Sequence, residues 1–228
     1  MATREVLAEL AELYRRKAET GVAIESVGGV EAARRIRAGE PFDVAVLADE
    51  AMACLESEGR VVRETRVAVA TSGVAVAVRA GSAPPDIGTE DAVRKAILEA
   101  SSIGYSTGPS GVHLARLFER WGIAEAIRSR TVQPPPGVPV GTLVASGQVQ
   151  IGFQQLSELV HLPGIRVVGA LPPEIQVTTT FSGGICTTSA QHQAARAWLS
   201  FITSREGDDV KRRHGMEPPV FANRGNAA

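Results

Sequence analysis

The amino-acid sequence predicts a bilobal α/β fold, in which the chain leaves one lobe, builds a second lobe and returns to the first. Short apolar segments alternate with amphipathic helical stripes, which is typical of an α/β protein. In addition, two long apolar strands of similar composition, 66–78 and 176–187, flank a self-contained α/β set. We expect these two strands to form a hinge, with a ligand cleft between the lobes.

The first lobe is predicted from the N-terminal third of the chain and from its end. Its expected elements are a helix over 4–18, a strand over 22–27, a helix over 30–38, a strand over 42–47 and a helix over 49–58. The helices show apolar residues at helical spacing, and the strand over 42–47 is continuously apolar, as in a sheet buried on both faces. This alternation predicts a mainly parallel sheet.

The second lobe is predicted from the segment between the two long strands. Its expected elements are a helix over 89–100, a strand over 103–106, helices over 110–121 and 139–147, a strand over 149–153 and a helix over 155–160. A stiff polyproline loop is expected at 131–137. The chain then returns to the first lobe through a helix over 189–203 and a polar tail. Lobe 1 therefore comprises 1–70 plus 183–228, and lobe 2 comprises 74–177.

Composition and charge exclude several classes of function. A hydrophobic share of 44% and a charged share of 21% are those of a globular domain. The net charge of −1 predicts no nucleic-acid partner. The apolar run at 67–78 is too short to insert into a membrane and is interrupted by Gly73. Cys54 and Cys186 show no metal-ligand spacing, so we expect buried free thiols, no metal and no cofactor.

The segment 101–113 carries the most chemical information. It reads as a short strand from Ile103 to Ser106, a loop of small residues and a helix that opens at Ser110. Such a loop presents free backbone N–H groups and the positive end of a helix dipole to an anion. The alternative is an ordinary helix cap in a βα unit.

Several segments, in the same order, resemble the molybdate-binding-protein branch of the type 2 periplasmic solute-binding proteins. The matching stretches are residues 29–44, 104–111, 147–155 and 214–218. The resemblance implies two mixed sheets joined by two hinge strands, with the family's first strand missing here. It also implies a periplasmic protein that delivers a small anion to the membrane subunits of an ABC transporter. No signal peptide is evident, so the protein would be cytoplasmic if the chain as written is the native start.

The resemblance also places the ligand-binding residues. They are Thr3, Gly28, Gly29, Ser106, Pro109, Ser110, Gly111, Val140, Gly141, Gln154 and Gln155. Two of these positions depart from the family pattern. Glycine replaces a hydroxyl residue at Gly28-Gly29, and glutamine replaces a tyrosine at Gln155. Because a glutamine amide can donate to a carboxylate and accept from a hydroxyl, we expect a small organic acid rather than molybdate.

Three functions remain open from the sequence. The first is a solute-binding protein for a small anion. The second is an enzyme, because some relatives of this branch resemble aconitate isomerases, which move a proton within a tricarboxylate; His113 and Tyr105 are candidates for that transfer. Their structural alternatives are a partly exposed helix residue and a packing residue on the strand. The third is the effector domain of a regulator, which we rank last because no helix-turn-helix is evident.

Overall fold

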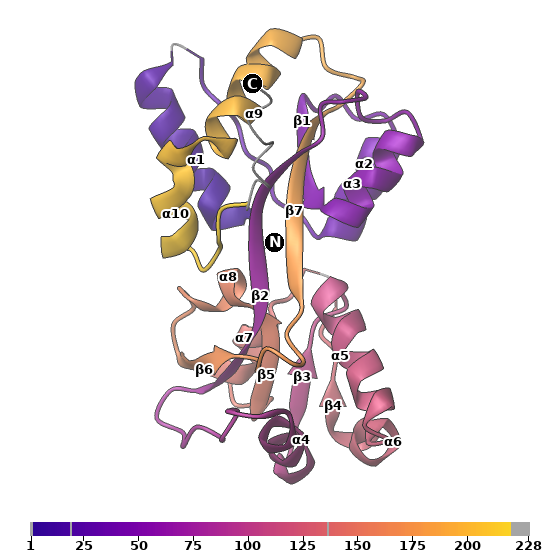
Figure 1. Ribbon diagram of the computed structural model, residues 1–228, viewed down its shortest axis with the longest axis vertical. Coiled ribbons are helices and arrows are strands. Elements are labelled where there is room, and N and C mark those ends of the chain that lie inside the picture. Colours follow the sequence, from indigo (N-terminus) through magenta and orange to yellow (C-terminus); the bar gives the residue numbers. More distant parts are fainter. Residues whose placement is uncertain (1, 19, 136, 220–228) are drawn as a thin grey trace, which may run out of the picture.

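The protein consists of two lobes stacked along its longest axis and joined by two long strands (Figure 1). The structure, a computed structural model, describes residues 2–18, 20–135 and 137–219. The connecting strands are β2 (Val67–Arg79) and β7 (Thr178–Ile185). This arrangement confirms the predicted bilobal α/β fold.

The helices and strands divide between the lobes as follows. Lobe 1 contains α1 (Arg4–Lys17), α2 (Gly29–Arg37), β1 (Val44–Ala48), α3 (Asp49–Ser57), α9 (His192–Thr203), η2 (Arg205–Gly207) and α10 (Asp208–Arg213). Lobe 2 contains α4 (Glu90–Glu99), β3 (Ile103–Tyr105), α5 (Pro109–Arg120), α6 (Ala124–Ile127), η1 (Arg128–Arg130), β4 (Thr131–Val132), α7 (Val140–Ala145), β5 (Ile151–Gln155), α8 (Leu156–Leu159) and β6 (Ile165–Ala170).

Strand β2 belongs to the sheets of both lobes. From Val67 to Gly73 it pairs with β7, and from Val74 onward it pairs with β5 and β6. At the changeover, the Gln176 side chain bonds to both backbone groups of Val74. Its Oε1 accepts from Val74 N at 2.9 Å, and its Nε2 donates to Val74 O at 3.0 Å. The side-chain amide thus satisfies the backbone groups of β2 where the neighbouring strand changes.

The prediction of a mainly parallel sheet is wrong. The strand order is β1-β7-β2-β5-β3-β4, with β6 also paired to β2. All pairs that involve β2 or β7 are antiparallel, and only β3 pairs in parallel, with β4 and β5. The reason is the return of the chain through β7, which runs beside β2 in the opposite direction.

The elements differ from the prediction in several places. Residues 22–27 form no strand, although their composition is strand-like, because no strand pairs with them in the described structure. Strand β6 was not predicted. The expected polar tail contains α10, whose acidic first turn and basic last turn both complement the helix dipole. The expected polyproline loop over 131–137 begins with β4 instead, because Thr131 and Val132 pair with β3, and Pro136 lies outside the described residues.

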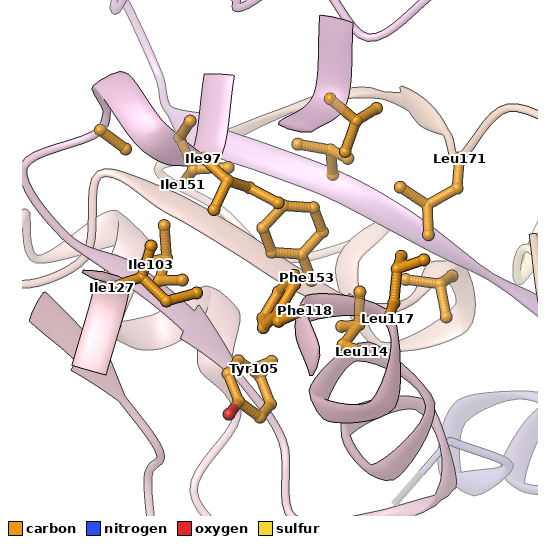
Figure 2. Close-up of a cluster of buried hydrophobic side chains, with 14 of the residues drawn as sticks. Ile97, Ile103, Tyr105, Leu114, Leu117, Phe118, Ile127, Ile151, Phe153 and Leu171 are labelled. Atoms are coloured by element: carbon orange, nitrogen blue, oxygen red, sulfur yellow. The ribbon is translucent and has the colours of Figure 1, made fainter. Parts of the chain in front are cut away.

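Each lobe has its own apolar core. In lobe 2, Phe118 and Phe153 lie at the centre of a cluster between the sheet and helices α4 and α5 (Figure 2). Tyr105 meets Phe118 edge to face, with ring centroids 5.5 Å apart. In lobe 1, α1 and α9 pack on one face of the sheet around Leu10 and Trp198, whereas α2 and α3 cover the other face. Separate cores allow a cleft to exist between the lobes.

The two cysteines lie in different environments. Cys186 is buried, with 1% of its surface exposed, and burial, followed by the nearby Asp43, raises the pKa of its thiol to about 11. Cys54 is exposed on α3, so the prediction that both thiols are buried is wrong for this residue. The helical periodicity of α3 buries Met52 and Leu55 and turns Cys54 outward.

This difference predicts selective thiol labelling. Because the thiolate is the reactive form, dithiobis-nitrobenzoate should react quickly with Cys54 in the folded protein and with Cys186 only after unfolding. Absorbance should report one fast thiol in native protein and both thiols in guanidinium chloride. A Cys54→Ser variant should lack the fast phase; fast labelling of this variant would contradict the burial of Cys186.

Gly111, in the first turn of α5, predicts a strong stability effect. A β-carbon at this position would overlap the carbonyl oxygen of Ser106. Gly111→Ala should therefore lower the free energy of unfolding by about 3 kcal/mol, as expected for a forced overlap in a packed site. The matched control is Gly21→Ala, where a β-carbon meets nothing within 4 Å. Equal urea midpoints for the two variants would contradict the geometry.

Candidate functional site

A cavity of about 1450 Å³ opens between the lobes and takes residues from both of them. This volume exceeds the roughly 300–1,000 Å³ of most ligand sites. The excess arises because the cavity continues from the interlobe cleft along β1, where Val44, Val46 and Trp198 form an apolar wall. Within the described sheet, β1 pairs with β7 alone. The interlobe cleft is the part of the cavity that takes residues from both lobes.

The N-termini of three helices form much of the cleft wall. Thr3 precedes α1, Gly28 precedes α2 and Gly108 precedes α5, and each of these residues lines the cavity. None of the three helix starts has a side-chain cap. The first-turn N–H groups and the positive ends of the helix dipoles therefore favour an anion in the cleft.

The loop before α5 adds two hydroxyl groups to this wall. The Oγ atoms of Ser106 and Ser110 lie 3.2 Å apart, and the Ser106 Oγ also accepts from Gly108 N at 3.4 Å. Ser110 is almost fully buried. The helix begins at Pro109 rather than at Ser110, and Ser110 does not cap it. The Ser110 hydroxyl is thus held by Ser106 at the cavity wall.

The end of β5, the parallel neighbour of β3, supplies two glutamines beside the loop that precedes α5. The Oε1 of Gln154 accepts from Gly141 N at 3.2 Å. The Nε2 of Gln155 donates to the Thr179 hydroxyl at 2.7 Å. The Oε1 of Gln155 is buried and has no hydrogen-bond partner among the described residues. Because buried polar atoms are normally paired, this oxygen marks a place where a bound ligand can donate a hydrogen bond.

Glu158, on α8, also lines the cavity, although it is not among the site residues expected from the sequence. Burial raises the pKa of its carboxyl, and a hydrogen bond with Gln154 acts in the opposite direction. No ion pair joins Glu158 to a cation within the described part of the chain. The signal in the sequence was an acidic residue just after the two glutamines, on a helix that follows a buried strand.

Most of the predicted ligand residues line the cavity. Those that do so are Thr3, Gly28, Gly29, Ser106, Pro109, Ser110, Gln154 and Gln155. Gly111, Val140 and Gly141 differ from the prediction, because they lie behind the wall. Gly111 packs under Ser106, Val140 is fully buried, and the N–H of Gly141 is already bonded to Gln154.

The structure does not bring the two predicted catalytic candidates to the cavity. His113 lies one turn into α5, where its Nε2 is 3.1 Å from the carbonyl oxygen of Ile175. The Tyr105 ring packs in the lobe 2 core, where burial raises its pKa, and Figure 2 shows its hydroxyl at the edge of that cluster. Both positions match the structural alternatives named for these residues, because each side chain is used in packing or in a contact within lobe 2.

The described residues contain no group of His, Cys, Asp and Glu side chains that could hold a metal ion. Within the same part of the chain, no helix has the length and apolar character needed to cross a membrane.

Comparisons with known proteins agree with this geometry. The chain is 36% identical to an aconitate isomerase from Pseudomonas sp over 218 residues, which cover 92% of this chain and 82% of the relative. It is 26% identical to the molybdate-binding protein ModA of Azotobacter vinelandii over 187 residues, 79% of this chain and 73% of the relative. The solved periplasmic molybdate-binding protein of Azotobacter vinelandii superposes with a TM-score of 0.79 at 18% identity, covering 96% of each chain.

The profile of one protein family covers both lobes. Residues 1–217 match the bacterial extracellular solute-binding proteins. This match includes the hinge strands, the helix N-termini and the glutamines of the cleft, so the chain belongs to the family of bacterial extracellular solute-binding proteins.

Proposed function

We propose that the protein captures a small organic carboxylate in the interlobe cleft and delivers it, in the periplasm, to the membrane subunits of an ABC-type transporter. The observation that carries this proposal is the convergence of three uncapped helix N-termini on one cavity. The Ser106 and Ser110 hydroxyls add further neutral donors beside them. Neutral donors of this kind stabilise an anion by hydrogen bonds and dipoles.

Four features favour an organic acid over a tetrahedral metal oxyanion. Gly28 and Gly29 provide no hydroxyl donor at the second helix. The N–H of Gly141 is occupied by Gln154. The unpaired Oε1 of Gln155 requires a donor, which fully ionised molybdate lacks and which a hydroxyl or a protonated carboxyl provides. The cavity volume of about 1450 Å³ also leaves room for a carbon skeleton.

A second candidate function is isomerisation of an unsaturated tricarboxylate in the same cleft. The observation in its favour is the 36% identity to an aconitate isomerase across 92% of this chain. The reaction would remove a proton from the methylene carbon of the bound acid and return it to the far carbon of the double bond. The double bond shifts by one position, so the reaction is balanced without a cofactor.

Titration calorimetry tests the ligand class. The chain should bind citrate or aconitate more tightly than molybdate. Ser110→Ala should weaken acid binding by about ten- to a hundred-fold, because a lost charge-assisted hydrogen bond costs roughly 1.5–3 kcal/mol. The control is Ser146→Ala, an exposed serine of lobe 2 whose hydroxyl bonds only to the Leu143 carbonyl among the described residues. Submicromolar molybdate binding with no response to the acids would contradict the proposal.

Proton NMR separates the two candidate functions. An isomerase should convert trans-aconitate into cis-aconitate at a rate proportional to protein concentration, whereas a binding protein should leave the acid unchanged. Heat-denatured protein provides the baseline. If calorimetry detects aconitate binding and NMR detects no conversion of trans-aconitate, isomerisation is excluded and solute capture is the function.

A further inference from the structure

The cleft wall of lobe 2 contains one carboxyl group, that of Glu158, among its described residues. We propose that Glu158 is the catalytic residue that carries the proton between two carbons of a bound unsaturated polycarboxylate. This inference rests on the isomerase candidate described above and names the residue that performs its chemistry.

The other carboxylates in the described cavity wall are less suited to this role. All of them belong to lobe 1: Glu25, Glu31, Asp43 and Glu50. The first two are paired with arginines of α2, and Asp43 accepts a hydrogen bond from a serine hydroxyl 2.6 Å away. The fourth is exposed on α3. A carboxylate held by arginine is a weak base, and an exposed one has no fixed geometry.

The surroundings of Glu158 combine partial burial with a hydrogen bond to Gln154. Gln154 is anchored because its Oε1 accepts from the N–H of Gly141, which leaves the amide nitrogen for the Glu158 carboxyl. Burial raises the pKa of this carboxyl. A raised pKa makes the ionised form a stronger base toward carbon and brings the group closer to the optimum for exchanging a proton near neutral pH.

The same cleft also stabilises the charge that the reaction creates. When the Glu158 carboxylate takes the methylene proton, the C–H electron pair spreads over the allyl unit and its carboxylates. The N-termini of α2 and α5 are directed at this cavity and favour that negative charge. Protonated Glu158 then gives the proton to the far carbon. One group both accepts and returns the proton, so the enzyme ends in its starting state.

The experiment compares the intact chain with Glu158→Gln and with a matched control, Glu174→Gln. Glu174 is an exposed glutamate of lobe 2 that does not line the cavity. Conversion of trans-aconitate is followed by proton NMR, and aconitate binding is measured by calorimetry. Glu158→Gln should slow conversion by about 10²–10⁴-fold, the usual contribution of general acid–base catalysis, while its dissociation constant stays within about tenfold of the wild-type value. Glu174→Gln should match the wild type in both.

Each other result overturns the assignment in a different way. If Glu158→Gln converts the acid at a rate close to that of the wild type, isomerisation stands but Glu158 does not carry the proton. If Glu158→Gln loses binding together with conversion, the carboxyl belongs to ligand recognition instead. If the wild type binds aconitate but converts none of it, both the isomerase function and the assignment of Glu158 are wrong. Solute capture is then the function that the result supports.

Discussion

The architecture depends on one strand, β2, that is hydrogen-bonded into both sheets. At Val74 its neighbour changes from β7 to β5 and β6, and the side-chain amide of Gln176 satisfies the backbone groups at that point. A β-carbon at Gly73 would lie 3.2 Å from this amide, so the amide would have to shift by a few tenths of an ångström to admit one. Because the lobes share this strand but have separate apolar cores, a cavity can open between them without exposing either core.

The groups at the cavity that favour a negative charge are mainly neutral. Backbone N–H groups at helix starts and paired serine hydroxyls need little desolvation compared with a buried arginine or lysine, so an anion site built from them carries no large cost in the empty protein. Glu158 is then the exception, an acidic side chain in a site suited to anions. Its raised pKa follows from the same burial that makes the N–H donors effective. The proposed ligand binding and the proposed proton transfer would both draw on one property of the cleft, its limited contact with water.

The structural relatives show how far the sequence can change within this fold. A molybdate-binding protein with 18% identity shares the fold over 96% of both chains, so the bilobal frame tolerates wide sequence change. In this chain Gln154 occupies the Gly141 N–H and Gln155 presents an unpaired acceptor, so these two side chains help to set the balance of donors and acceptors in the cleft.

The sequence by itself determined the local elements and the bilobal order of the chain. Helical spacing located α1, α4 and α5, and two long apolar strands with an α/β set between them predicted the two lobes. The glycine- and serine-rich turn before α5 also predicted a wall of the cavity. These signals are local, because periodicity and turn chemistry are set by neighbours along the chain.

Only the tertiary structure decided the sheet directions and the chemistry of the site. Antiparallel pairing follows from β7 returning beside β2, and residues 22–27 are not a strand because no neighbour pairs with them. His113 was a plausible catalytic residue by type, but its contact with the Ile175 carbonyl lies outside the cavity. Glu158 looked like an ordinary helix residue, since burial and the Gln154 contact arise only after folding. Solvent exposure and hydrogen-bond partners are properties of the folded whole, so the sequence could not supply them.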